Sequence, residues 1–252
     1  MTRLTSCPDD ESVAQRAAEE IVRALERARE QRGVAHLALS GGTTPGRTYE
    51  LLAARREALD GVELWFADER CVPPDDEQSN YLLVRRTLID AAELPAERVH
   101  RMRGELGPEQ GAAAYSQELL QRLGGDGGGG SPPVLDVIVL GIGPDGHVAS
   151  LFPGAATLDA SCGELAQGVR DSPKPPPERI TLSLAVLRAA RGCLLLATGA
   201  AKSDAVSAML GEPSKHVPAS LLRRERLSVI VDDDAAPPGP PPSSSGTTPA
   251  ER

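Results

Sequence analysis

The sequence predicts an α/β fold: a single-domain, Rossmann-like sheet, mostly parallel, with helices on both faces. Strand, turn and helix alternate along the 252-residue chain, an order typical of parallel sheets covered by helices. Segment 134–140 is unbroken, apolar and β-branched, which indicates a strand buried on both faces. The hydrophobic fraction of 40% and charged fraction of 25% are typical of a soluble globular protein. We expect this domain to span 1–231, with a flexible insertion at 124–133 and a disordered Pro/Ser-rich tail at 232–252.

The first half of the chain supplies three strands and four helices. A proline and three acids at 8–11 favour a helix start, apolar residues then recur at helical spacing, and Gly33 ends the helix. Strands are predicted at 34–39 and 62–67, separated by a glycine-rich turn at 40–46 and a helix at 47–56. A polar loop at 68–78 precedes a helix at 79–90, a short strand at 99–102 and a helix at 108–123.

The second half repeats the pattern. The strand at 134–140 leads into a loop at 141–147, and a proline-rich segment at 173–177 predicts a rigid connector. Segment 180–190 reads as a strand that becomes a helix, followed by a strand at 192–198, a helix at 200–210 and a last strand at 227–231. Because parallel strands share one carboxyl edge, where such sheets bind ligands, the loops that leave them are expected to converge.

Charge and composition exclude several classes of function. The chain carries 27 Lys plus Arg against 36 Asp plus Glu, a formal net charge of −9, which argues against a non-specific nucleic-acid binder. Four widely spaced cysteines predict reduced thiols in a cytoplasmic protein, and scattered histidines make a structural zinc site unexpected. No apolar run approaches the ~20 residues that a membrane helix needs.

Two loops of the first half carry candidate binding groups. Ser40, Gly41, Gly42 and Thr43 follow a strand and precede a helix, so hydroxyls and free N–H groups can bind phosphate oxygens; an ordinary tight turn is the alternative. At the end of the next strand, Asp68-Glu69-Arg70 offers a cation for a phosphate or a local ion pair in a solvated turn.

Two loops of the second half add a base and a cation. The run 141–147 matches G-x-G-x-x-G, but the context does not favour a dinucleotide site, because no long amphipathic helix follows. His147 is suited to general-base chemistry near neutral pH, although a structural histidine is the alternative. Lys202, in the expected first turn of the 200–210 helix, opposes the helix dipole, which favours a bound anion or else a solvated side chain.

Together these segments resemble the 6-phosphogluconolactonase family of the glucosamine/galactosamine-6-phosphate isomerase superfamily. The likeness rests on Ser-Gly-Gly-Thr-Thr-Pro at 40–45, Asp-Glu-Arg-Cys-Val-Pro-Pro at 68–74, Ser-Asn at 79–80, Gly-x-Gly-Pro-Asp-Gly-His-Val-Ala-Ser-Leu-Phe-Pro at 141–153 and Gly-Ala-Ala-Lys at 199–202. Glucosamine-6-phosphate deaminases share two of these loops. They carry a functional glutamate where this chain has Phe152, and tyrosine where it has Arg70.

The resemblance implies hydrolysis of 6-phospho-D-glucono-1,5-lactone to 6-phosphogluconate in the oxidative pentose phosphate pathway, with no cofactor and no metal. It implies a general base at His147, supported by Asp145. The substrate-binding set that it implies is Ser40, Gly41, Gly42, Thr43, Asp68, Arg70, Gly146 and Lys202. We expect a cytoplasmic monomer or weak homodimer; a deaminase or isomerase of the same fold and a sugar-phosphate-sensing module are the alternatives.

Overall fold

The structure, a computed structural model, describes residues 2–124, 131–159 and 164–238 and contains two sheets. The main sheet has six parallel strands in the order β1-β9-β8-β5-β2-β3. They are β1 (Arg3–Cys7), β2 (Ala35–Leu39), β3 (Val62–Phe66), β5 (Val137–Gly141), β8 (Gly192–Ala197) and β9 (Leu227–Asp232). A small antiparallel sheet has the order β4-β7-β6, with β4 (Asp68–Arg70), β6 (Ala166–Val169) and β7 (Arg179–Leu182).

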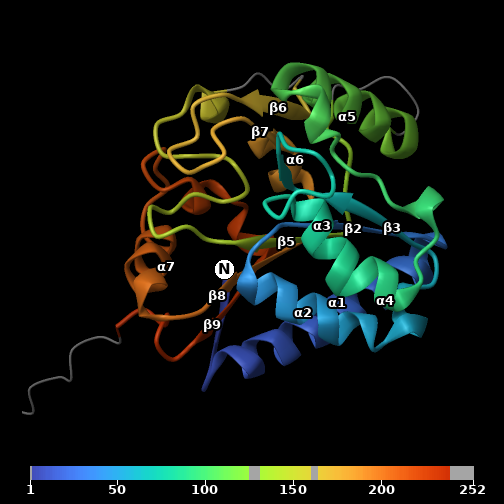
Figure 1. Ribbon diagram of the computed structural model, residues 1–252. Coiled ribbons are helices and arrows are strands. Elements are labelled where there is room, and N and C mark those ends of the chain that lie inside the picture. Colours follow the sequence, from blue (N-terminus) through green and yellow to red (C-terminus); the bar gives the residue numbers. More distant parts are fainter. Residues whose placement is uncertain (1, 125–130, 160–163, 239–252) are drawn as a thin grey trace, which may run out of the picture.

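Helices cover both faces of the main sheet, as predicted. In Figure 1, α1 and α2 lie below the sheet, while α5, α6 and the small sheet lie above it. The α-helices are α1 (Asp10–Arg32), α2 (Thr43–Ala53), α3 (Asn80–Val84), α4 (Asp90–Ala92), α5 (Pro108–Leu123), α6 (Leu184–Ala189) and α7 (Ser203–Leu210). A π-helical turn (Arg85–Ile89) joins α3 to α4. Short 3₁₀ turns lie at Arg56–Leu59, Ala96–Arg98, Gly104–Leu106, Ala156–Asp159, Ala200–Lys202, Pro218–Leu221 and Arg224–Arg226.

The first helix shows why the sequence patterns succeed. Asp9 caps α1 by accepting a hydrogen bond from the backbone N–H of Ser12 at 2.7 Å. Gly33 ends it with a φ of 76°, the left-handed region that glycine adopts without strain. The repeated apolar residues, among them Ile21 and Leu25, are fully buried against the sheet, where each contributes about 1.5–3 kcal/mol.

Four short elements differ from the prediction. The strand β6, which pairs with β7, lies in a segment for which no strand was predicted. The edge strand β1 was not predicted, because it is short, mostly exposed and recognisable only by its pairing with β9. The segment Asp68–Arg70 was expected to be loop but pairs with β7 as β4. The strand expected at 99–102 is wrong: Val99 forms one isolated bridge, with Leu64, and no ladder.

The two expected flexible regions fall partly outside the described residues. Within the insertion predicted at 124–133, residues 125–130 lie outside them, whereas Pro133 is buried. At the C-terminal end, β9 continues to Asp232, and a turn follows in which Ala235 is fully buried. The backbone N–H of Ala235 donates to Asp232, so the expected tail begins with ordered chain; residues 239–252 lie outside the described part.

Candidate active site

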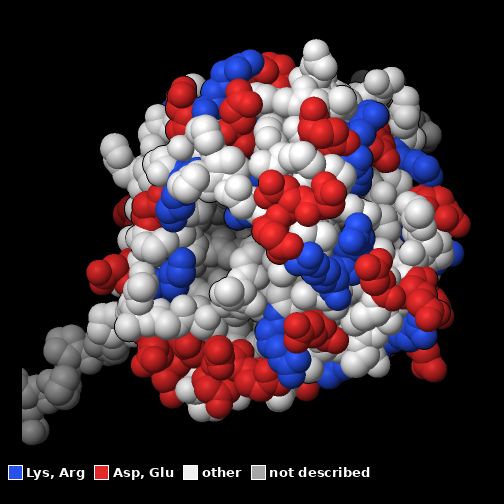
Figure 2. Space-filling model, in the orientation of Figure 1, with Lys and Arg blue, Asp and Glu red and all other residues white. Residues whose placement is uncertain are grey.

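A cavity of about 310 Å³ opens at the carboxyl edge of the main sheet. Figure 2 shows it as a hollow with blue basic groups inside it and at its rim. Every loop singled out above contributes to its lining: Ser40, Gly41, Gly42, Thr43, Thr44, Pro45, Asp68, Arg70, Asn80, Gly141, Ile142, Gly143, His147, Ala149, Lys174, Pro175, Arg179, Leu196, Ala197, Thr198 and Lys202. The topology of a parallel sheet therefore brings together residues that lie up to 162 positions apart, from Ser40 to Lys202.

The loop after β5 holds a histidine–aspartate pair against the cavity. Nδ1 of His147 lies 2.5 Å from Oδ1 of Asp145. Burial lowers the pKa of His147 even though Asp145 raises it, so the imidazole is neutral at neutral pH. Because the carboxylate of Asp145 accepts a hydrogen bond from the Nδ1–H group of His147, Nε2 keeps its lone pair, as a general base requires. Gly143 is necessary here, since a side chain at this position would overlap both members of the pair.

The loop after β2 presents donors to the same cavity. The structure starts α2 at Thr43, four residues before the predicted start, so Thr43 and Thr44 belong to its first turn. The hydroxyl of Ser40 is buried and has no hydrogen-bond partner among the described residues. Gly41 packs so closely on Asn80 that any side chain would collide with its amide oxygen. Unpaired donors at a helix N-terminus are suited to binding an anion.

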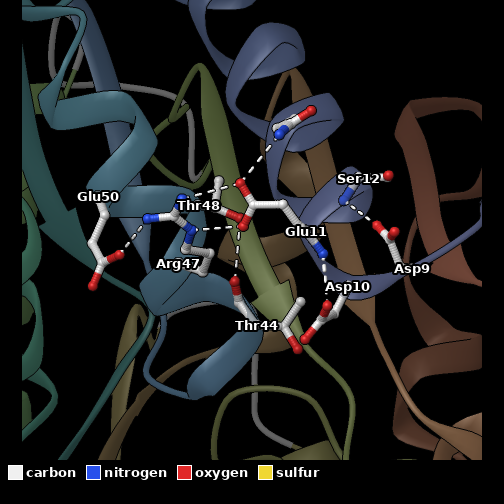
Figure 3. A network of polar contacts seen from close by, with 9 residues as sticks. Asp9, Asp10, Glu11, Ser12, Thr44, Arg47, Thr48 and Glu50 are labelled. Carbon is white, nitrogen blue, oxygen red and sulfur yellow. Dashed lines mark hydrogen bonds and ion pairs between the residues drawn. The ribbon is translucent and has the colours of Figure 1, made fainter.

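A surface network fixes the start of α2 relative to α1, as Figure 3 shows. The guanidinium of Arg47 donates to both carboxylate oxygens of Glu11, at 2.7 and 3.0 Å, and to Glu50 at 2.7 Å. Exposed ion pairs contribute only about 0–1 kcal/mol each. The two hydrogen bonds from Arg47 to Glu11 nevertheless hold the start of α2 in a defined position relative to the start of α1.

Two cations enter the cavity from opposite loops. Arg70, on β4, donates from one terminal nitrogen to the carbonyl of Gln78 at 2.5 Å, while its Nε has no partner in the described chain. Nζ of Lys202 donates to the carbonyl of Ile142 at 2.8 Å. Lys202 was expected inside a helix; it instead ends a 3₁₀ turn, and α7 begins at Ser203. Burial, followed by the charge of Lys174, lowers the pKa of Lys202.

Asp68 is buried at the cavity wall and fully engaged. Its Oδ2 accepts a hydrogen bond from the hydroxyl of Ser150 at 2.8 Å, and the amide of Asn80 donates to its carbonyl oxygen at 2.9 Å. The neighbouring Glu69 points away from the cavity and accepts hydrogen bonds from the backbone N–H groups of Asn80 and Tyr81, both at 2.7 Å. Burial raises the pKa of Glu69 to about 7. The two adjacent acids thus have different roles. Asp68 lines the cavity, whereas Glu69 binds the backbone at the start of α3.

Two predicted site residues, Asp145 and Gly146, do not line the cavity; Asp145 instead contacts His147, which does. Gly146 was assigned to substrate binding, yet it does not line the cavity. Its φ of +82° and its contact with Val217, which lies 2.9 Å from the position of an added Cβ, make it a turn and packing residue. Gly143, from the same motif, takes the place at the wall.

Several lining residues were not predicted as site residues, among them the polar residues Asn80, Lys174 and Arg179. Asn80 follows the helix cap Ser79, and this Ser-Asn pair belongs to the resemblance, so a signal was present. Lys174 and Arg179 flank the prolines of segment 173–177, whose stiffness was the only property predicted. Their position at the cavity could not be predicted from the sequence, because it depends on the path that the chain takes between β6 and β7.

The described residues offer no metal centre: no group of three or more His, Cys, Asp or Glu side chains converges within 2–124, 131–159 and 164–238. Over the same part of the chain, no helix has the length and apolar character to cross a membrane.

Residues 8–231 match the family model described as glucosamine-6-phosphate isomerases/6-phosphogluconolactonase. The chain belongs to this family. It is 37% identical over 219 residues to the 6-phosphogluconolactonase of Mycobacterium leprae, covering 84% of this chain and 87% of that relative. It is 38% identical over 225 residues to that of Streptomyces coelicolor, covering 84% of each chain. The 6-phosphogluconolactonase structure from Trypanosoma cruzi superposes with a TM-score of 0.83 at 25% identity, covering 93% of this chain and 96% of that one.

These findings confirm the family predicted from the sequence. The matched region contains every loop that lines the cavity, so family membership and site geometry concern the same part of the chain. The family model covers isomerases as well as lactonases; the curated relatives named here are all lactonases.

Proposed function

We propose that this protein hydrolyses 6-phospho-D-glucono-1,5-lactone to 6-phosphogluconate in the oxidative pentose phosphate pathway, with His147 as general base. The observation that carries the proposal is the contact of Asp145 with His147, which lines a cavity whose other walls supply cations and unpaired donors. A six-carbon sugar phosphate needs both functions at once: a base near C1 and an anion site near the phosphate.

The proposed reaction proceeds in two steps. Nε2 of His147 takes a proton from water while the water oxygen bonds to C1, and the carbonyl electron pair moves onto the carbonyl oxygen. The tetrahedral intermediate then reforms the C1 carbonyl, the bond between C1 and the ring oxygen breaks, and His147 returns its proton to that ring oxygen. Asp145 keeps the ring of His147 oriented and stabilises the imidazolium between these steps. A lactone is already an activated ester, so the reaction needs no cofactor.

The phosphate end is assigned to Arg70 and Lys202, with the N-terminus of α2 and the hydroxyl of Ser40. The unpaired Nε of Arg70 and the unpaired Ser40 hydroxyl support this, because buried polar atoms without a partner are costly unless a ligand completes them. Asp68 and the loop Gly41–Gly42–Thr43 complete the proposed binding set.

The alternative of a deaminase is disfavoured by one contact. The ring of Phe152 lies 4.7 Å from that of His147, centroid to centroid, so an apolar group occupies the place where the deaminase pattern carries its functional glutamate. A base beside an apolar ring suits attack by water, whereas the proton transfers of a deaminase need the second acid.

A monomer or weak homodimer is the working form that we propose. The free thiols of Cys7, Cys71 and Cys193 support a reducing compartment, and we place the protein in the cytoplasm.

The test is acid release from freshly made 6-phosphogluconolactone, corrected for spontaneous hydrolysis, in parallel with ammonia release from glucosamine 6-phosphate. We expect the first and not the second; ammonia release without lactone turnover would overturn the proposal. In the same assay, His147→Ala should lower kcat by about 10²–10⁴-fold with a smaller change in KM. The exposed His216, which does not line the cavity, supplies the control variant His216→Ala.

A further inference from the structure

One lysine in the cavity has no role in the reaction described so far. Of the three lysines in the chain, Lys174 and Lys202 line the cavity, and only Lys202 follows a strand of the main sheet. Lys174 lies in the segment 172–177, which contains four prolines and which we call the proline strap.

The strap is held rigidly at both ends and at its centre. The backbone N–H of Ser172 donates to the carbonyl of Pro177 at 3.0 Å, which closes the strap on itself. The buried guanidinium of Arg179 donates to the carbonyls of Lys174, Pro175 and Pro176 at 3.1–3.2 Å. Four prolines remove backbone freedom as well. The backbone of Lys174 therefore has one position, set by an arginine that itself lines the cavity.

This position brings the ammonium group of Lys174 to the catalytic pair. Nζ of Lys174 lies 3.8 Å from Oδ1 of Asp145, the same oxygen that lies 2.5 Å from Nδ1 of His147. One carboxylate oxygen thus lies between the imidazole and the ammonium. At 3.8 Å the ammonium is close enough to be attracted but has room to shift toward a ligand.

A surface ion pair between Lys174 and Asp145 does not by itself explain why a rigid strap carries Lys174 to this position. The side chain of Lys174 is 44% exposed, and pairs of that kind contribute about 0–1 kcal/mol. A cation beside a general base instead meets the requirement of ester hydrolysis, which builds negative charge on the carbonyl oxygen of the attacked carbon.

We propose that Lys174 is a catalytic residue for the lactone end of the substrate: its ammonium donates a hydrogen bond to the C1 oxygen as that oxygen becomes negative, and then holds the carboxylate of the product. This inference rests on the proposed lactonase function. No proton leaves Lys174 in the cycle: His147 accepts and returns the proton, and the electron pair that moves onto the C1 oxygen returns when the ring bond breaks.

The charge of Lys174 also acts on the base. Burial is the main cause of the lowered pKa of His147, and the nearby ammonium lowers it further, against the effect of Asp145. Removal of the ammonium should therefore shift the acid limb of the kcat/KM profile to higher pH, a readout that a purely structural role of the strap would not move.

Two ligands that differ only at C1 isolate the proposed contact. The product 6-phospho-D-gluconate carries a carboxylate there, whereas D-glucitol 6-phosphate carries a neutral CH₂OH group and the same phosphate. Calorimetry should give Lys174→Met about tenfold weaker binding of the gluconate and unchanged binding of the glucitol. Lys174→Arg should recover part of the loss, and Lys202→Met should weaken both ligands alike.

Kinetics provide the second arm. Lys174→Met should lower kcat by about 10–100-fold, less than the 10²–10³-fold typical of a fully enclosed oxyanion donor, because Lys174 is half exposed. Lys215→Met, at an exposed lysine paired with Asp159, is the control.

Equal weakening of both ligands would overturn the inference and move Lys174 to the phosphate. Unchanged binding with unchanged kcat would leave it a solvated side chain, which also overturns the inference. Failure of the proposed function is distinguishable, because wild-type protein would then not turn over the lactone at all.

Discussion

The hydrogen bond between Asp145 and His147 is the contact on which the proposed mechanism depends most directly. Burial alone would raise the pKa of Asp145, but the hydrogen bond and charge of His147 lower it, so the carboxylate is ionised at neutral pH. In Asp145→Asn an amide can donate to Nδ1, which would move the imidazole proton to Nε2 and leave no base facing water. Asp145→Ala removes the hydrogen-bond partner of His147 but does not favour the tautomer with its proton on Nε2.

The size of the effect follows from the exposure of the pair. A hydrogen bond to a charged group contributes about 1.5–3 kcal/mol, and each 1.36 kcal/mol is about tenfold in rate. Fully buried dyads lose about 10⁴-fold when the aspartate becomes asparagine. Because the side chain of Asp145 is 35% exposed, solvent screens the pair, and we expect kcat to fall by about 10–100-fold in Asp145→Asn. The loss in Asp145→Ala should be smaller.

The assay is steady-state lactone hydrolysis with the spontaneous rate subtracted, together with the unfolding midpoint as a check on folding. The matched control is Asp159→Asn, at an aspartate that also pairs with a lysine, Lys215, but forms no pair with His147. A kcat within twofold of wild type for both Asp145 variants would refute the argument that Asp145 orients the base.

Two further predictions concern packing and pH. Gly143→Ala should lower kcat at least tenfold in the same assay, because the added methyl group must displace His147, and wild-type turnover would show that the loop adapts. At the opposite edge of the sheet, burial alone would lower the pKa of His100, but hydrogen bonds with Glu118 and Glu63 raise it. His100 therefore stabilises the fold below its unfolded pKa near 6.5, and this stability is lost as pH rises through the higher folded pKa. NMR titration of the ring tests this, and a pKa below 6.5 would contradict it.

Elements with strong local periodicity could be predicted from the sequence. The helix that ends at Gly33 and the central strand β5 carry their own signals, a cap and a buried apolar run. By contrast, β1 and β4 form because they pair with strands far along the chain, β9 and β7. The local sequence pattern of a segment does not show such long-range pairing. The strand expected at 99–102 failed for the same reason, since no neighbour offers it a ladder.

The site could be predicted where its residues follow strands of the main sheet. His147, Arg70 and Lys202 lie at the carboxyl edge because parallel topology leaves no other place for the loops that carry them. Lys174 reaches the cavity by another route, along a strap whose position is set by a buried arginine. Gly146 does not line the cavity, because a glycine motif does not reveal which glycine lies at the wall and which one turns the chain.

The cavity also explains how a chain with a net charge of −9 can receive an anion. Its lining includes the cations Arg70, Lys174, Arg179 and Lys202, and the acid Asp68 is occupied by hydrogen bonds from Ser150 and Asn80. Screening over about 8–10 Å at physiological salt makes the acids elsewhere on the surface nearly irrelevant to a ligand inside the cavity. Those acids still oppose an extended polyanion, which must lie along the surface instead of entering the cavity. A negative surface around a small basic cavity therefore favours a single sugar phosphate over nucleic acid. This selectivity depends on the four cations being gathered inside the cavity, because the same cations spread over the surface would not provide it.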